Sequence, residues 1–244
     1  MVRLLYPVPS IAPPRIQIDG PRYHYLVRVR RLEAGDSLEV FDGTGRSFEA
    51  RISSIDAQKA EIELGPSMAM RSVRSITLVQ ALPKAGKMEW ILQKATELGA
   101  SAFAPAFTKR SVPQPAQATM VRRVVRWQKI VEEAARQCGR NDVPRVSEPR
   151  PVLEVVKSML PTTRVVVLNE REPHLTLSQV YSGIDAGHPI ALVTGPEGSF
   201  EDSELASLLD AGATSARLGE RILRTETASV AALAILLHLE GRLG

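Results

Sequence analysis

The sequence predicts an α/β protein in two parts, a small N-terminal β-domain over residues 1–70 and a larger domain over residues 71–244. Two observations carry this prediction. Apolar and polar residues alternate in the first part, as in strands with one solvated face. From Ile76 onward, short apolar runs alternate with segments of helical spacing, which is typical of a mostly parallel sheet covered by helices.

The N-terminal part is predicted to form a small antiparallel sheet or barrel. Residues 37–41 have strand-like composition and lead into a glycine turn at 43–45. The next run places Phe48, Ala50 and Ile52 on one face. Strand-like alternation returns at 60–64, and the polar stretch 65–75 indicates a linker.

The second part alternates strands with helices. Met88, Ile91, Leu92 and Ala95 recur at helical spacing, and Gly99 is suited to end that helix. The predicted strands are 76–82, 102–107, 164–168, 190–194 and 216–218, and the predicted helices include 88–98, a long basic one at 117–137 and a last one at 226–238.

The last helix carries no charge between Ala228 and Leu237. A helix that is apolar all round must be buried on every side. We therefore expect it at the centre of the domain or at a subunit interface. Thr225 is predicted to cap its N-terminus, and Glu226 suits the first turn because it faces the positive end of the helix dipole.

Composition excludes several classes of protein. A single cysteine rules out an intramolecular disulfide, and Cys138 is interpreted as a small buried thiol. The four histidines show no metal-ligand spacing, so metal catalysis is not expected. The N-terminus lacks the apolar run of a signal peptide and no stretch approaches ~18 apolar residues, so we expect a cytoplasmic protein without a membrane partner.

The net charge of +4 is unevenly distributed. Residues 1–70 hold nine basic and nine acidic side chains, residues 71–150 hold 15 and six, and residues 151–244 hold seven and 12. A positive middle next to a negative end indicates a polyanion-binding surface beside a pocket that does not bind phosphate. The alternative is that the basic residues around 122–129 form one solvated helix face.

Two glycine-rich loops each follow a short apolar strand and lead into a helix. One runs from Gly195 to Phe200 and the other from Gly219 to Thr227. Ligands of open α/β sheets bind beyond the carboxyl ends of the strands, so the loops predict one composite pocket, with a third edge at 169–171. Two structural turns in an ordinary α/β domain are the alternative.

The pocket lacks the marks of a phosphate site. Neither a Walker loop nor a G-x-G-x-x-G fingerprint is present, which excludes phosphate-dependent NTPases and dehydrogenases. Glu197, Glu201 and Asp202 would repel a phosphate. A neutral or cationic ligand with an adenine-like face fits better.

Segments 194–198 and 218–228 resemble the cofactor loops of the SPOUT class of methyltransferases, and within it the bacterial 16S ribosomal RNA uracil-N3 methyltransferases. The chain departs from the family pattern at Ser199, where glycine is usual, and at Cys138, where serine is usual. Segments 23–29, 35–36, 41–43, 82–99, 109–112 and 132–140 are also similar to this family, so the resemblance covers nearly the whole chain.

The resemblance implies a PUA-like RNA-binding β-barrel at 1–70 and a SPOUT domain with a deep trefoil knot at 71–244. It also implies a homodimer that binds S-adenosyl-L-methionine. The implied reaction is methylation of N3 of a uridine in the small ribosomal subunit, in the assembled 30S particle. Two alternatives are a SPOUT enzyme that methylates a ribose 2′-hydroxyl and a non-catalytic RNA-binding assembly factor.

The candidate catalytic residues are Arg224, Glu197 and Glu226. Arginine stays charged and donates in a fork, so Arg224 would stabilise a uracil anion, unless it forms a structural pair with Glu226. Glu197 would orient the cofactor or act as a base; otherwise it is an ordinary acid at a helix start. The predicted cofactor contacts are Leu168, Asn169, Thr194, Gly195, Pro196, Glu197, Gly198, Leu218, Gly219, Ile222, Leu223, Arg224 and Thr227.

Basic residues of both parts are predicted to contact RNA. Most would bind phosphates, which positions the RNA without reading its sequence. Arg110 and Arg140 belong to family-like segments and would alternatively reach the active site, across the dimer. The set is Arg28, Arg30, Arg31, Lys84, Lys87, Lys109, Arg110 and Arg140.

Overall fold

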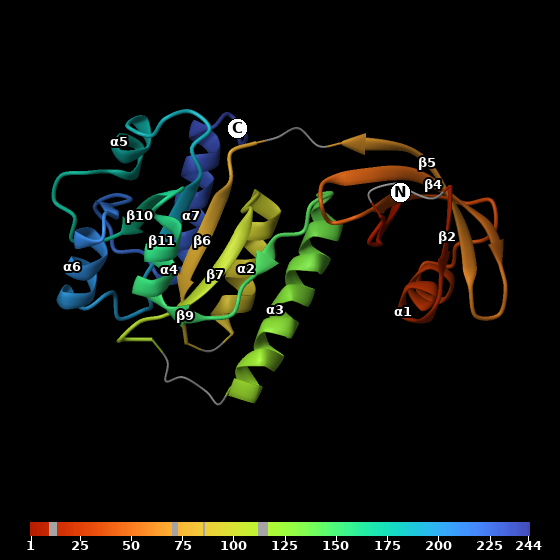
Figure 1. Cartoon of the computed structure of the whole chain (residues 1–244), viewed down its shortest axis with the longest axis horizontal. Helices are drawn as coiled ribbons and strands as arrows, with labels where there is room; N and C mark the ends of the chain where they lie inside the picture. The colour runs from red at the N-terminus through yellow and green to blue at the C-terminus, as the bar shows by residue number, and fades with distance from the viewer. Residues whose placement is uncertain (10–13, 70–72, 85, 112–116) are drawn as a thin grey trace. The chain divides into compact units, whose positions relative to one another are not determined.

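The computed structural model describes residues 1–9, 14–69, 73–84, 86–111 and 117–244 (Figure 1). The chain divides into two compact units. One comprises residues 1–72 together with 135–143, and the other comprises 73–134 together with 144–244. The boundary expected after residue 70 lies outside the described residues.

The first unit is built on a five-stranded sheet in the order β1–β3–β4–β5–β2. β1 runs parallel to β3, and the other neighbouring strands are antiparallel. Phe48, Ala50 and Ile52 are buried, which confirms the predicted alternation. The elements are β1 (Val2–Leu5), β2 (Arg15–Ile18), α1 (Gly20–Tyr23), the π-helix η1 (His24–Val29), β3 (Ser37–Phe41), β4 (Arg46–Ile55) and β5 (Ala60–Ala69).

The predicted linker is wrong over residues 65–69, because β5 continues to Ala69. Gly65 is explained by the sheet instead. A Cβ at this position would lie 2.9 Å from the backbone oxygen of Glu49, next to an irregularity in the pairing of β4 with β5. A glycine inside a strand often marks such a close backbone approach. Residues 70–72 of the predicted linker lie outside the described residues.

The second unit is built on a seven-stranded parallel sheet, which confirms the predicted class of sheet. Its main order is β12–β10–β11–β6–β7–β8, with β9 also paired to β7. The strands are β6 (Ile76–Ala81), β7 (Ala102–Phe107), β8 (Arg145–Val146), β9 (Arg150–Pro151), β10 (Arg164–Leu168), β11 (Ile190–Thr194) and β12 (Thr214–Ala216).

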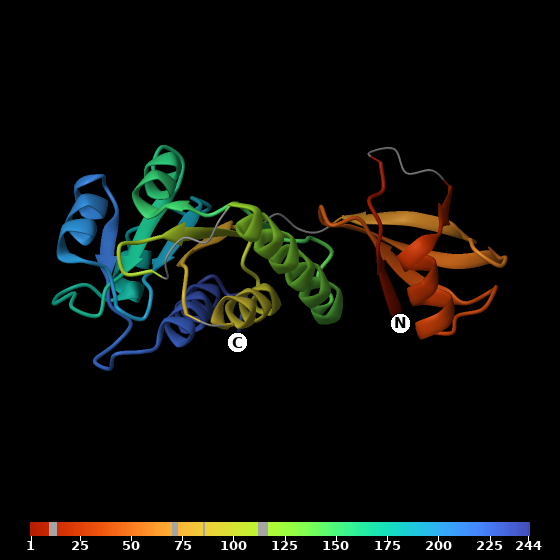
Figure 2. The ribbon, with the colours of Figure 1, turned by 90° about the horizontal axis from the view of Figure 1, so that it is seen from below.

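Helices cover this sheet. α7 packs against β6, β11 and the neighbouring α2, whereas α4 packs on β6, β7 and β10 and contacts α6 (Figures 1 and 2). β11 is buried at every position, as expected for a central strand. The helices are α2 (Lys87–Leu98), α3 (Gln117–Cys138), α4 (Val152–Met159), α5 (Leu177–Ser182), α6 (Asp202–Asp210) and α7 (Thr225–Leu239).

Several boundaries and environments differ from the sequence-based expectation. β12 ends at Ala216 instead of Leu218. Thr225 is the first helical residue of α7, so its predicted role as N-cap is wrong, and Arg224 occupies that position. Cys138 is exposed at the end of α3, so the interpretation as a buried thiol is also wrong. Gly99 does end α2, with a φ of 125° that only glycine adopts readily.

In the described ranges, no helix combines the length and the apolar character needed to cross a membrane.

Candidate functional site

A cavity of about 380 Å³ lies at the carboxyl ends of three neighbouring strands of the second unit. Leu168 ends β10, Thr194 ends β11 and Ala216 ends β12, and all three line the cavity. The rest of the wall comes from the loops that follow these strands, from the start of α7 and from Lys87. The two glycine-rich loops therefore meet in one pocket, as the sequence predicted.

The predicted cofactor residues collect in this cavity with two exceptions. Gly198 and Thr227 do not line it, whereas the other predicted contacts do. The carbonyl of Gly198 instead accepts a hydrogen bond of 2.8 Å from Arg110, which lies in the loop after β7. Arg110 therefore holds the first glycine loop from the side.

Gly195 and Gly219, one in each loop, lack a side chain for different physical reasons. A Cβ on Gly195 would lie 3.1 Å from the Phe200 ring, so this position is small because Phe200 packs against it. Within the described part of the chain, a Cβ on Gly219 would meet no atom within 4 Å, and the backbone there is not in the left-handed region. Because Gly219 lines the cavity, its missing side chain leaves space for a ligand.

Thr194 supplies a second sign of a ligand site. Thr194 lines the cavity and is buried, yet its hydroxyl has no hydrogen-bond partner among the residues that the structure describes. A buried polar atom without a partner costs about 1–3 kcal/mol, so native proteins rarely keep one without a reason. A ligand with a polar group at this point would satisfy it.

Three charged side chains meet beside the cavity; Lys87 and Glu197 line it, whereas the predicted catalytic residue Glu226 does not. Lys87 Nζ lies 3.0 Å from Glu197 Oε1 and 3.1 Å from Glu226 Oε2. The backbone N–H of Lys84 also donates to the Glu197 carboxylate, at 3.1 Å. Lys87, expected among the RNA contacts, therefore lies against two candidate catalytic residues.

These contacts shift the pKa of all three groups. Burial raises the pKa of Glu197, but backbone N–H groups and Lys87 lower it by more, so the net shift is downward. The pKa of Glu226 is lowered in the same way, by its own backbone N–H and by Lys87 against the effect of burial. Hydrogen bonds to both carboxylates raise the pKa of Lys87. The cluster is therefore ionised at neutral pH, and both carboxylates are weak bases.

Arg224 lies in the cavity wall immediately before α7, with an exposed side chain. Glu226 forms its ion pair with Lys87, and the charge of Arg224 is the smallest of the causes that lower the Glu226 pKa. The arrangement thus favours a guanidinium available to a ligand over a structural Arg224–Glu226 pair.

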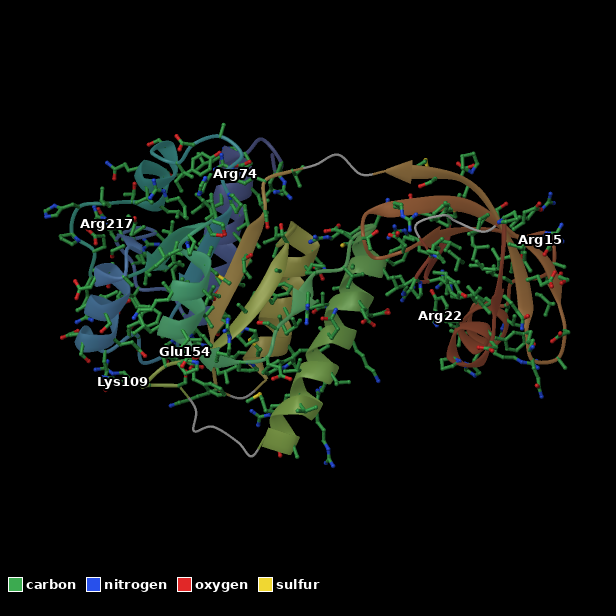
Figure 3. All side chains as sticks on the ribbon, viewed as in Figure 1. Arg15, Arg22, Arg74, Lys109, Glu154 and Arg217 are labelled. Carbon is green, nitrogen blue, oxygen red and sulfur yellow. The ribbon has the colours of Figure 1, made fainter. Side chains whose placement is uncertain are left out.

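The other predicted RNA contacts are spread over both units. Arg28, Arg30 and Arg31 are exposed at the end of η1, and Lys84 is exposed before α2. Lys109, labelled beside α6 in Figure 3, is engaged within the protein: its Nζ lies 3.1 Å from Glu201 and donates to Ser203.

Arg140 is also engaged within the protein, since its Nε donates to Asp142 at 3.1 Å.

Some residues of the cavity wall were not among the predicted cofactor contacts, although most of them lie in the loops that predicted the pocket. Ser199 has a φ of 57°, and its hydroxyl donates to the Glu170 carboxylate across two loops. The departure from the usual glycine was visible in the sequence, but its partner was not. The wall also includes Glu170, Ser199, Phe200, Ala216, Arg221, Thr225 and Ala228, beyond the predicted set.

Comparisons with known proteins agree with this geometry. A family model described as an RNA methyltransferase domain matches residues 70–237, and one described as an RNA methyltransferase PUA domain matches residues 18–65. The ribosomal RNA small subunit methyltransferase E of Bacillus subtilis is 33% identical, with 90% of this chain and 88% of the relative covered. The enzyme of the same name from Synechocystis is 34% identical, over 95% of this chain and 76% of the relative.

Solved structures show the same likeness. A crystal structure of ribosomal RNA small subunit methyltransferase E from Neisseria gonorrhoeae, bound to S-adenosyl methionine, matches with a TM-score of 0.85. It is 29% identical, and the match covers 98% of both chains.

Proposed function

Because this chain belongs to the ribosomal RNA small subunit methyltransferase E family of RNA methyltransferases, we propose that it methylates N3 of a uridine in 16S ribosomal RNA. The methyl donor is S-adenosyl-L-methionine, and the substrate is the assembled 30S particle. The observation that carries the proposal is the cavity between the two glycine loops, which joins an open glycine position, a buried hydroxyl without a partner among the described residues, and the ionised Glu197.

The residues of the cavity fit this cofactor. Its volume is within the range of small-molecule sites, ~300–1,000 Å³. S-adenosylmethionine supplies a methyl group on a positively charged sulfonium, and the ionised Glu197 and Glu226 favour a cation nearby. The predicted loop residues would hold the cofactor. A polar group of the cofactor would pair with the Thr194 hydroxyl, and Gly219 leaves space for the cofactor to approach the backbone closely.

The chain must also promote loss of the N3 proton of uracil, which is bound at neutral pH. Arg224 stabilises the developing anion on the uracil oxygens, because its charge is permanent and its donors form a fork. The lowered pKa of Glu197 and of Glu226 makes them poor proton acceptors, so we assign them to cofactor orientation. Lys87 keeps both carboxylates in place.

We propose that residues 1–70 form a PUA-like barrel that binds RNA and that residues 71–244 form a SPOUT domain with a deep trefoil knot. The match of the PUA family model to residues 18–65 supports the first assignment. The sheet order β10–β11–β6, which joins strands distant in sequence, is compatible with the second.

A homodimer is supported by α7, which was expected to be buried on every side. Val230, Ala231, Ala234 and Ile235 are only partly buried in the single chain. A second copy packed on this apolar face would complete their burial. The cytoplasm, where ribosomes are assembled, is the location that suits this substrate.

Calorimetric titration with S-adenosylmethionine tests the proposal. Gly219 lines the cavity, and a Cβ there would meet no described atom within 4 Å, so Gly219→Ala tests whether the ligand needs this space; we expect at least tenfold weaker binding than in the wild type. Gly183→Ala adds the same group outside the cavity, where a Cβ makes an ordinary contact of 3.6 Å, and should bind as the wild type does. Absence of binding by the wild type would instead support the non-catalytic assembly factor.

A further inference from the structure

A chain of buried hydrogen bonds runs from α7 through β6 to the first glycine loop. Gln80 Nε2 donates to Thr225 Oγ1 at 3.0 Å, and Thr225 Oγ1 donates to the carbonyl of Gly195 at 2.6 Å. At the other end, the Ser229 hydroxyl donates to Gln80 Oε1. We propose that this chain is a positioning device, through which Gln80 and Thr225 hold the cofactor loop in its binding conformation; the proposal rests on the methyltransferase function above.

The Gly195 carbonyl fixes the direction of the two hydrogen bonds that involve the Thr225 hydroxyl. The Gly195 carbonyl only accepts, so the single proton of the Thr225 hydroxyl must point to it. Thr225 Oγ1 must then accept from Gln80, which turns the amide nitrogen of Gln80 toward Thr225 and its oxygen toward Ser229. The second N–H of Gln80 donates to the carbonyl of Ala81 at 2.9 Å. The Ser229 hydroxyl also lies 2.9 Å from the carbonyl oxygen of Thr225, so its single proton has two acceptors, that oxygen and Gln80 Oε1.

Burial makes the chain more than a surface contact. Gln80 and Ser229 are fully buried, and Thr225 is 5% exposed. A buried side-chain amide near the end of β6 gains nothing from burial unless its partners are in place. An apolar residue would fill the same volume in β6 without this requirement. These buried hydrogen bonds therefore favour one particular conformation of the loop, beyond what close packing alone would require.

The position of the chain links it to the site. Thr225 directly follows Arg224, and Gly195 lies two residues before Glu197. Thr225 and Gly195 both line the cavity. One hydrogen bond thus joins the two cofactor loops next to both candidate functional side chains. If it is lost, the loop that starts at Gly195 loses its buried hydrogen bond to the start of α7 and keeps the more exposed link through Lys87, which contacts both Glu197 and Glu226.

The decisive variants are Thr225→Val, which keeps the shape but removes the hydroxyl, and Thr225→Ser, which restores it. Thr96→Val is the matched control, because Thr96 is a fully buried threonine of α2 whose hydroxyl donates to Leu92 outside the cavity. Backbone amide hydrogen exchange over residues 195–200 is measured without cofactor. The KM for S-adenosylmethionine and kcat are measured separately.

We expect Thr225→Val to exchange at least tenfold faster across this loop and to raise the KM at least tenfold, with a smaller change in kcat. Thr225→Ser should return both values to within about threefold of the wild type, and Thr96→Val should leave both unchanged. Unaltered loop exchange in a folded Thr225→Val protein, or equal effects of Thr96→Val, would overturn the proposal.

A second variant covers the case in which Thr225→Val fails to fold. Ser229→Ala removes the far end of the chain without touching the cavity, and we expect faster exchange of the same loop in the same direction. Unchanged amide exchange of this loop in Ser229→Ala would count against the proposal that the hydrogen-bond chain holds the loop in place. A wild type that neither binds nor uses S-adenosylmethionine refutes the proposed function, whereas the exchange measurement still tests the hydrogen-bond chain by itself.

Discussion

Lys87 at the start of α2 and Glu197 in the loop after β11 meet at 3.0 Å in the wall of the cavity. The same ammonium group contacts Glu226 at the start of α7. One cation thus ties together three segments that are far apart in the sequence. This relationship gives the lysine of a family-like segment a role inside the site, next to the residues expected to orient the cofactor.

Replacing Lys87 by Met should weaken cofactor binding and change the pH dependence of stability. The pKa of Glu197 and Glu226 is lowered in the folded protein, so their ion pairs stabilise it above the ordinary carboxylate pKa. That contribution is lost as the pH falls through the lowered values. We expect the variant to unfold at a lower temperature than the wild type at pH 7, and the difference between the two unfolding temperatures to shrink as the pH falls below the ordinary carboxylate pKa.

Lys94→Met is the control for this experiment, because Lys94 pairs with Glu97 on the same helix but outside the cavity. It should leave the affinity for S-adenosylmethionine unchanged. If the unfolding temperatures of Lys87→Met and the wild type differ by the same amount at every pH, the ion pairs of Lys87 with Glu197 and Glu226 are not the source of the difference.

Arg224→Ala should slow methyl transfer itself. Loss of one donor to a developing anion typically costs about 100-fold or more in rate. We expect a loss of this order in single-turnover rate, with the dissociation constant of S-adenosylmethionine changed by less than about threefold. Arg224→Lys keeps the charge but not the forked donors, so its single-turnover rate should lie between those of Arg224→Ala and the wild type. Equal rates for Arg224→Ala and the wild type would show that another group stabilises the anion.

Ser199 has a strained backbone conformation, and two variants separate the cost of this strain from the loss of its hydrogen bond. Its φ of 57° is costly for any side chain, whereas glycine adopts it freely. Both Ser199→Ala and Ser199→Gly lose the hydrogen bond to Glu170, but only the alanine keeps the strain. We expect the glycine variant to be more stable than the alanine variant by about 1 kcal/mol in the free energy of unfolding. Denaturant titration measures this, and the reverse order would show that the backbone is not left-handed there.

Arg30 should contact RNA through phosphates. Arg30→Ala is expected to reduce the slope of log affinity against log salt by about 0.7–0.9 and to weaken binding similarly for different sequences. Lys109→Ala is the comparison, because Lys109 already pairs with Glu201 and Ser203. Fluorescence anisotropy across a salt series measures both. A larger effect of Lys109→Ala would mean that its ion pair opens to bind RNA.

Local periodicity was enough to predict most of the architecture. The buried run of β11 and the helical spacing of Met88, Ile91 and Leu92 are properties of neighbouring residues, and both elements form where expected. Boundaries failed where a tertiary contact decides. Gly65 is a glycine because the backbone of β4 comes close to it, not because it begins a linker. The Thr225 hydroxyl donates to the Gly195 carbonyl instead of capping its own helix.

The site shows the same division. Two loops rich in glycine predicted the pocket, because both follow strands whose carboxyl ends meet. Lys87, Ser199 and Gln80 were assigned no such role, since their partners Glu197, Glu170 and Thr225 are distant in sequence. No spacing rule within one segment reports such pairs; only the strand order β10–β11–β6 brings them together.

The most direct test uses purified protein, labelled S-adenosylmethionine and small ribosomal subunits from a strain that lacks the gene. The ribosomal RNA is digested, and the labelled nucleoside is identified by mass spectrometry. We expect label in N3-methyluridine. Label in a 2′-O-methyl nucleoside would contradict the proposed reaction while leaving the fold and the cofactor pocket in place.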